Sequence, residues 1–207
     1  MTKKDLLIKA AQLYGFDTAS AKEVHGHEGG RNLVFMIGND SVLRVSSLSD
    51  RSIEDYEAEI EYVHYLSEGG ASVAESIPSG KGNHIEIIDE KVVTMFEIAK
   101  GDQIADHGYK YIDGVSINEY FYLTGKVLGK IHALSKNYSP IHKRFDFFEK
   151  YNENYFESLI PDDFCCLHMK MGRRVKDRLH KILEELRKLP RSSENYGMVQ
   201  FDYSDGN

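Results

Sequence analysis

Several features that would assign a protein to a membrane or secreted class are missing from this chain. No apolar run approaches the roughly 18 residues of a transmembrane span, and residues 1–9 carry charges within their apolar stretch, unlike the hydrophobic region of a signal peptide. The two cysteines are neighbours, Cys165 and Cys166, and adjacent cysteines rarely form an unstrained disulfide. We therefore expect a protein of a reducing compartment, the cytoplasm.

The chain also lacks an excess of positive charge. It has 26 lysines and arginines against 33 aspartates and glutamates, which gives a net charge of −7. This balance argues against a general binder of nucleic acids or of anionic membranes. With 207 residues and 41% hydrophobic content, the chain is long enough for one large or two small domains with a real core. Neither composition nor pattern indicates an oligomeric state.

The first half of the chain has the pattern of a β-rich unit. β-branched runs and turn signals within residues 19–46 predict three consecutive antiparallel strands. A short amphipathic helix over 3–15 precedes them, and a helix over 53–66 with an acidic first turn follows them. Two further strands, over 84–88 and 92–96, are predicted to form a hairpin with a two-residue turn.

The second half of the chain is predicted to be helical. Apolar residues recur with a period near 3.6 over 118–134, 143–159 and 169–189. The change of pattern near residue 97, followed by a polar segment with glycines, predicts a boundary there. We therefore expect an α+β chain with a β-rich domain over 1–97 and a helical domain over 98–207.

The last six residues place Asp202 and Asn207 five positions apart. This D-x-x-x-x-N spacing is that of a phosphoryl-transfer catalytic loop. In such a loop the aspartate orients and deprotonates an attacking hydroxyl, and the asparagine amide oxygen binds magnesium, a hard cation that prefers oxygen ligands. The motif alone is weak, because 33 acidic residues make chance matches common. Its weight comes from the β-rich and then helical sequence that precedes it.

With this layout the chain resembles the aminoglycoside phosphotransferase and choline kinase-like family. Residues 128–134, LGKIHAL, are similar to the family's LGxxHxL helix, and residues 196–207 correspond to its catalytic loop. The resemblance covers the whole chain and implies a protein kinase-like bilobal fold. In that fold a five-stranded antiparallel N-lobe is joined by a hinge to a mainly helical C-lobe.

The resemblance also assigns residues to a nucleotide site. Arg44 stands on a strand where the family has the residue that grips ATP phosphates, and Glu59 on the next helix is its expected ion-pair partner. Gly29 and Gly30 fall in the first hairpin, where the family's loop contacts the phosphates. Three hinge residues would bind adenine through the backbone: Met95, Phe96 and Glu97.

These residues also have purely structural interpretations, which the sequence leaves open. An arginine among apolar strand residues can be an edge residue whose charge reaches water, which would explain Arg44. A run of glutamates is often a solvated helix face, which would explain Glu59. Two adjacent glycines can simply form a hairpin turn, which would explain Gly29 and Gly30.

The resemblance implies Asp202 as the catalytic base, Asn207 as a Mg²⁺ ligand, and ATP or GTP as the phosphoryl donor. The expected activity is the transfer of the γ-phosphoryl group to a hydroxyl of a small molecule. Aminoglycosides, choline-like amines, amino alcohols and sugars all fit as acceptors. No nucleic acid or membrane partner is expected.

The chain departs from the family's pattern at three positions. Gln200 stands where the family usually has histidine, Phe201 where it has a small residue, and Arg44 where it has lysine, whose point charge a guanidinium does not reproduce. These departures favour the alternative function, a catalytically inactive kinase-fold protein that binds nucleotide or regulates another protein. The family's second metal-binding aspartate follows the asparagine by about a dozen residues or more. We therefore expect a longer protein, and little phosphoryl transfer from residues 1–207 alone.

Overall fold

The computed structural model describes residues 1–24, 32–49, 51–101, 114–150, 152, 154–155, 158 and 169–199. The chain divides into two compact units, residues 1–143 with 197–207, and residues 144–196. The limit between the two predicted domains, after residue 97, falls inside the first of these units. That limit therefore stays a prediction.

Six strands in the described part of the chain form one antiparallel sheet, in the order β1-β2-β3-β6-β4, with β5 also paired to β6. Their bounds are β1 (Ala21–Val24), β2 (Leu33–Ile37), β3 (Ser41–Ser47), β4 (Ser76–Ile77), β5 (Glu86–Ile88) and β6 (Lys91–Glu97). The expected mixed fold with an antiparallel sheet is confirmed. The predicted number of five strands is wrong, because the two-residue strand β4 is too short to show a periodic pattern and forms only by pairing with β6.

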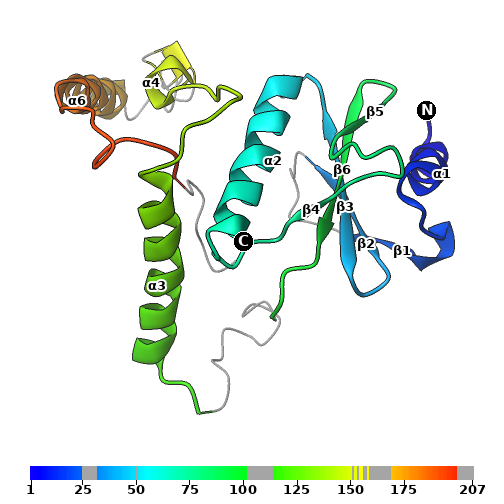
Figure 1. Ribbon diagram of the computed structural model, residues 1–207. Helices are drawn as coiled ribbons and strands as arrows, with labels where there is room; N and C mark the ends of the chain where they lie inside the picture. Colours follow the sequence, from blue (N-terminus) through cyan, green and yellow to red (C-terminus); the bar gives the residue numbers. More distant parts are fainter. Residues whose placement is uncertain are drawn as a thin grey trace. The chain divides into compact units, whose positions relative to one another are not determined.

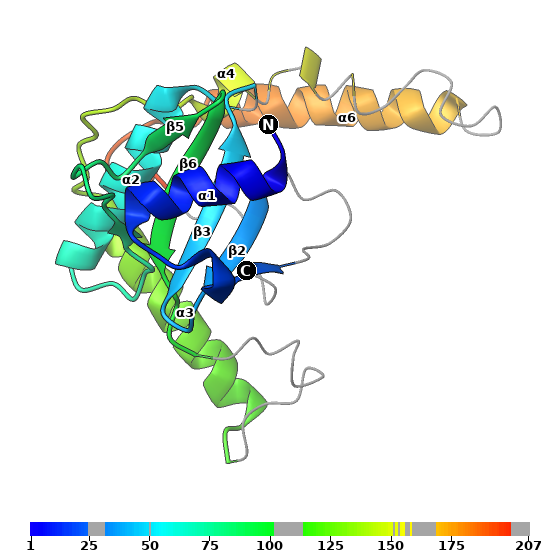
Figure 2. The same cartoon turned by 90° about the vertical axis from the view of Figure 1, so that its right-hand side faces the viewer.

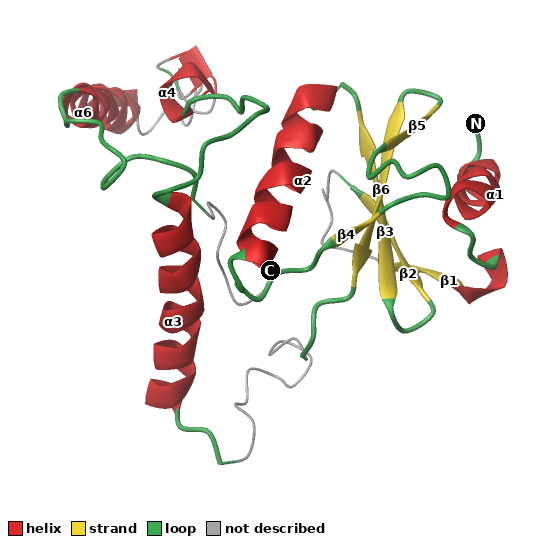
Figure 3. Cartoon of the chain, viewed as in Figure 1, coloured by secondary structure: helices red, strands yellow, loops and turns green. Residues whose placement is uncertain are grey.

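Two helices cover opposite faces of this sheet. Figure 1 and Figure 3 show the sheet between α1 (Lys3–Tyr14) and α2 (Ile53–Glu68), and Figure 2 shows α1 crossing β2 and β3. Side chains alternate between the two faces along a strand. The α1 face carries a core of buried residues from the helix and four strands: Leu6, Ala10, Phe35, Ile37, Leu43, Val45, Ile88, Val93 and Met95. Arg44, between Leu43 and Val45, therefore points to the α2 face.

Local signals explain where these two helices begin. Thr2 and Ser52 are the N-caps, and each forms a capping box with the aspartate three residues later, Asp5 and Asp55. A capping box satisfies backbone N–H groups that the first helical turn leaves without partners. Helix α1 ends at Gly15, which adopts the left-handed conformation that closes many helices, with a φ of 74°.

A third helix, α3 (Ile117–Ser135), packs against the C-terminal half of α2. Their shared cluster of buried residues consists of Tyr62, Leu66, Ala71 and Ile131. The hydroxyl groups of Tyr62 and Ser135 are hydrogen-bonded across this interface. A Cβ atom on Gly69 would lie 2.6 Å from Cδ2 of Leu134, so the end of α2 approaches α3 closely. This packing joins α2 to the helix that carries the LGKIHAL motif.

The second unit contains α4 (Phe147–Lys150) and α6 (Met169–Arg187). Helix α6 matches the predicted helix over 169–189. Of the predicted helix over 143–159, the described part includes α4, which begins four residues later than expected. No helix within the described ranges is both long enough and apolar enough to span a membrane.

The two-residue turn predicted between β5 and β6 is present, and its backbone conformation is unfavourable. Asp89 and Glu90 have positive φ angles of 46° and 60°. A left-handed conformation costs a residue with a side chain about 1 kcal/mol or more. Hairpin turns with two positive φ angles are for this reason normally built with asparagine, aspartate and glycine.

Replacing Glu90 with glycine is expected to raise the free energy of unfolding by about 0.5–1 kcal/mol, because glycine adopts this φ without steric cost. Urea unfolding of the two proteins measures the difference. Lys91→Gly is the matched control one residue later, where glycine inside a strand should lower the free energy of unfolding. Destabilisation of similar size by both substitutions would show that the turn carries no strain.

Candidate functional site

The candidate site is built on cross-strand pairs on the α2 face of the sheet. Arg44 of β3 lies opposite Thr94 of β6, and Val42 lies opposite Phe96. Directly opposed residues of antiparallel strands share a face, so these four side chains project toward the α2 side. The Arg44 guanidinium carbon lies 4.8 Å from the centroid of the Phe96 ring, which makes a cation–π contact.

Glu59 of α2 binds Arg44 on this face. Nη1 of Arg44 donates to Oε1 of Glu59 at 2.7 Å, and each side chain is 20% exposed. The expected ion pair is therefore present. Arg51, in the segment before α2, donates through its own Nη1 to Oε2 of the same carboxylate at 3.2 Å. Arg51 was not among the predicted site residues, because no local pattern distinguishes one arginine in a polar connector.

Arg44 has hydrogen-bonding capacity that the described residues do not use. Its Nε and Nη2 atoms are buried and have no hydrogen-bond partner in the described part of the chain, and the same is true of Oγ1 of Thr94. A buried polar group without a partner costs about 1–3 kcal/mol, and such groups are commonly satisfied by a ligand or water. The planar fork of a guanidinium matches the oxygens of a phosphate. The chemistry of this site therefore fits an anionic ligand.

The other predicted site residues lie in different places. Met95 pairs with Leu43 and is buried on the α1 face, so its side chain points away from Arg44. Glu97 ends β6, and its backbone N–H donates to the Glu75 carbonyl oxygen at 2.8 Å. A base bound at this segment would therefore need a different backbone group. Four predicted residues lie outside the described part of the chain: Gly29, Gly30, Asp202 and Asn207.

The predicted magnesium site also depends on residues outside that part. Within the described ranges, no group of three or more histidine, cysteine, aspartate or glutamate side chains could hold a metal ion. The donor named for magnesium, the amide oxygen of Asn207, has the chemistry that this cation prefers. The magnesium site stays a prediction that rests on this residue.

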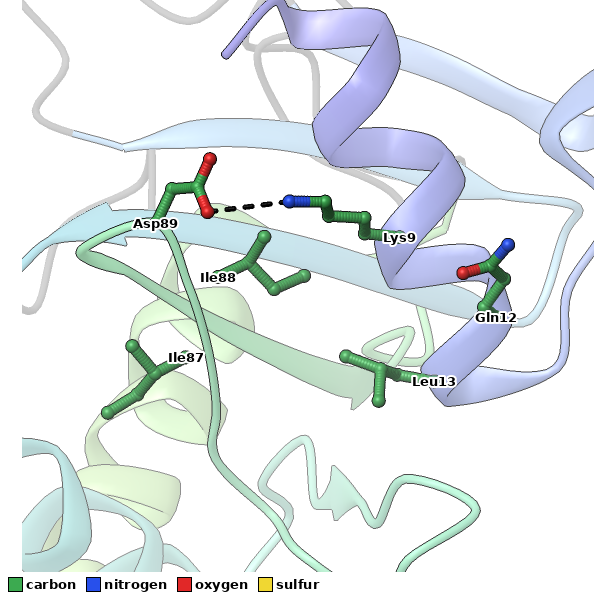
Figure 4. Close-up of a pocket in the computed structure, with 6 residues that line it drawn as sticks. All are labelled: Lys9, Gln12, Leu13, Ile87, Ile88 and Asp89. Carbon is green, nitrogen blue, oxygen red and sulfur yellow. Dashed lines mark hydrogen bonds and ion pairs between the residues drawn. The ribbon is translucent and has the colours of Figure 1, made fainter.

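A cavity of about 290 Å³ opens elsewhere, beside α1 and the β5–β6 hairpin (Figure 4). It is lined by Lys9, Gln12, Leu13, Ile87, Ile88 and Asp89. Nζ of Lys9 lies 3.4 Å from Oδ1 of Asp89 in an exposed ion pair. Because Arg44 points to the α2 face, this cavity is not part of the Arg44 site.

A second carboxylate of α2, that of Glu61, is bound by the segment that follows α3. It accepts hydrogen bonds from the Tyr138 hydroxyl at 2.8 Å and from the backbone N–H groups of Ile141 at 2.7 Å and His142 at 2.9 Å. Nδ1 of His142 also lies 2.9 Å from this carboxylate. Burial alone would raise the pKa of Glu61, but these hydrogen bonds outweigh it and lower the pKa to about 2. The ionised Glu61 carboxylate therefore attaches α2 to the segment that follows α3.

The chain is similar over nearly its whole length to an amicoumacin kinase of Bacillus subtilis (strain 168). The two sequences are 26% identical over an aligned stretch of 216 positions, gaps included, and this stretch covers 99% of this chain and 59% of the kinase. No protein-family model matches the chain.

Two solved structures match the fold. The amicoumacin kinase hAmiN, in complex with AMP-PNP, Ca²⁺ and Ami, matches with a TM-score of 0.76 and 24% identity, over 96% of this chain and 57% of its own. Spectinomycin phosphotransferase APH(9)-Ia, in complex with ADP and spectinomycin, matches with a TM-score of 0.61 and 13% identity, over 100% of this chain and 64% of its own.

The chain has the protein kinase-like fold of the aminoglycoside phosphotransferases. The predicted resemblance to this family is confirmed. The chain spans less than two thirds of the length of each of these relatives, from 57% to 64%.

The low pKa of Glu61 predicts a pH-dependent contribution to stability. Because the pKa falls from an ordinary value of 4.5 to about 2 on folding, the contribution is complete above the higher value and is lost as the pH falls toward the lower one. Glu61→Gln should lower the free energy of unfolding by about 1–2 kcal/mol at neutral pH. The loss should be much smaller near pH 2.

Urea unfolding across this pH range measures the effect. The matched control is Glu68→Gln on the same helix, since Glu68 is 69% exposed and its contact with His64 is at 3.6 Å. Exposed pairs of this kind contribute little to stability, so the control should change little at any pH. A Glu61→Gln loss of the same size at both ends of the range would contradict the assignment.

Proposed function

We propose that the protein is a nucleotide-dependent phosphotransferase that transfers the γ-phosphoryl group of ATP, or of GTP, to a hydroxyl of a small molecule. The observation that carries the proposal is the Arg44 guanidinium, which Glu59 holds while two of its donor atoms have no partner in the described part of the chain. Its setting in the fold of small-molecule kinases supports the same function. The proposal concerns the activity of the whole protein, and this chain spans 59% of the length of the amicoumacin kinase that it matches.

Arg44 is proposed to bind phosphate oxygens through Nε and Nη2 while Nη1 remains on Glu59. A guanidinium stays protonated at physiological pH, so it places a fixed positive charge where negative charge develops during transfer. The Phe96 ring beneath the guanidinium limits its movement. Gly29 and Gly30 are proposed to contact the phosphates through their backbone N–H groups.

The nucleotide base is proposed to bind at the segment Met95, Phe96 and Glu97. Since the Glu97 N–H is bonded to Glu75 and the Met95 side chain points to the α1 face, this contact relies on the remaining backbone groups near the end of β6. Phe96 is the member of this segment whose side chain faces Arg44.

Asp202 is proposed to orient the acceptor hydroxyl and to take its proton. The hydroxyl oxygen forms a bond to the γ-phosphorus, the bond from that phosphorus to the β–γ bridging oxygen breaks, and its electron pair leaves with the nucleoside diphosphate. A positioned general base of this kind contributes about 10²–10⁴-fold to the rate. Bound Mg²⁺, with Asn207 as one ligand, would neutralise charge on the phosphates.

The acceptor is proposed to be an aminoglycoside-like molecule, an amino alcohol or a sugar. The names of the relatives supply two acceptors to assay first, amicoumacin and spectinomycin. Both are small molecules, in agreement with the expected class of acceptor.

A second candidate is a catalytically inactive kinase-fold protein that binds nucleotide or regulates another protein. Arg44 in place of lysine, Gln200 in place of histidine and Phe201 in place of a small residue favour it. The two candidates differ in phosphoryl transfer, which the first requires and the second lacks.

Nucleotide binding is tested by calorimetric titration with Mg²⁺ and AMP-PNP. Arg44→Ala should raise the Kd at least about tenfold, which corresponds to about 1.4 kcal/mol, because it removes the proposed phosphate donors. Lys9→Ala is the control, since it removes a cation from an exposed ion pair on α1; its Kd should match that of the wild type. Wild-type affinity in Arg44→Ala would remove Arg44 from the site.

Transfer of labelled phosphate from ATP to amicoumacin or spectinomycin separates the two candidates. The assay compares the 207-residue chain and a C-terminally extended chain, each with and without Asp202→Asn. Turnover that Asp202→Asn abolishes supports the phosphotransferase. Nucleotide binding with no transfer by either chain favours the second candidate.

A further inference from the structure

Two carboxylates hold α2 from two different directions. Glu59 and Glu61 are two residues apart, so their side chains leave the helix roughly 200° apart. Glu59 binds Arg44 of the sheet, and Glu61 binds residues 138–142, the segment that follows α3. A rotation of the helix about its axis would move both carboxylates away from these partners.

The segment that receives Glu61 is itself fixed to α2. The Tyr138 ring packs against those of Tyr62 and Tyr65, with ring centroids 5.0 Å and 4.9 Å away. Two of the donors to Glu61 are consecutive backbone N–H groups, those of Ile141 and His142. Backbone donors cannot rotate away as a long side chain can, so they fix the carboxylate in space.

A neighbouring glutamate on the same side of α2 shows how specific this contact is. Glu57 lies one helical turn before Glu61, and its Oε2 atom is 3.6 Å from Nε2 of His142. Glu57 is 44% exposed, whereas Glu61 is 17% exposed. Of the two, Glu61 is the residue that accepts backbone hydrogen bonds within the described part of the chain.

We propose that Glu61 is a positioning residue for nucleotide binding: it fixes the rotation and axial position of α2 and so keeps Glu59 against Arg44. The inference rests on the proposed function, in which Arg44 binds phosphate. An axial slip of one residue displaces a side chain by about 1.5 Å, which is large compared with the 2.7 Å contact between Arg44 and Glu59. Without that contact the guanidinium is no longer aligned toward the phosphates.

The nucleotide arm of the test is a double-mutant cycle on the Kd of AMP-PNP with Mg²⁺. Glu61→Gln alone should raise the Kd about tenfold. In the Arg44→Ala background it should raise the Kd less than about twofold, because the contact that Glu61 maintains is already absent. The same factor in both backgrounds would overturn the proposal. Glu68→Gln, on the same helix, should leave the Kd unchanged in both.

The second arm uses no nucleotide, and it compares Glu59→Gln, Glu61→Gln and the double variant by urea unfolding. The side chains of Glu59 and Glu61 leave α2 in different directions, so independent roles would give additive shifts of the urea midpoint. A positioning role predicts that Glu59→Gln lowers the midpoint clearly in the wild type and by less than half as much in the Glu61→Gln background. Additive shifts would overturn the proposal.

The two arms separate the inference from the proposed function. If the wild-type chain binds no nucleotide while the midpoint shifts are non-additive, the phosphotransferase proposal fails and Glu61 still positions Glu59. If the chain binds nucleotide while both cycles are additive, the phosphotransferase proposal stands and the role of Glu61 is rejected.

Discussion

The Glu59 carboxylate connects α2 directly to the sheet and to the segment before the helix. The hydrophobic burial that packs a helix on a sheet has no preferred direction. A charge-assisted hydrogen bond does have one, and Glu59 makes two, to Arg44 of β3 and to Arg51 of the connector. Removing the carboxylate would leave a partly buried guanidinium without its counter-charge, which is far more costly than losing an exposed pair.

Most of the fold could be predicted because its elements depend on local signals. The capping residues Thr2 and Ser52 mark where two helices begin, and Asp89 with Glu90 marks the hairpin turn. Strand β4 could not be predicted in this way. Two residues have no period, and Ser76 and Ile77 become a strand only because β6 presents unpaired backbone groups beside them. The missed strand is therefore a product of tertiary pairing.

Among the residues of the candidate site too, some could be predicted from the sequence and others depend on tertiary packing. Arg44 and Glu59 could be predicted because the resemblance names both positions, and their ion pair is present. Glu61 could not, because its partners lie 77 to 81 residues further along the chain, and their approach depends on how α3 packs on α2. The side-chain direction of Met95 depends on the register between β3 and β6, which the sequence of neither strand determines alone.

The presence of arginine at position 44 has a consequence for chemical labelling. Reagents that acylate the amine of a phosphate-binding lysine, or condense with it, need a nucleophilic nitrogen. Arginine carries a delocalised positive charge and is not such a nucleophile, and here one of the Arg44 nitrogens is also bonded to a carboxylate. Nucleotide-mimicking acylating reagents would therefore leave this position unmodified.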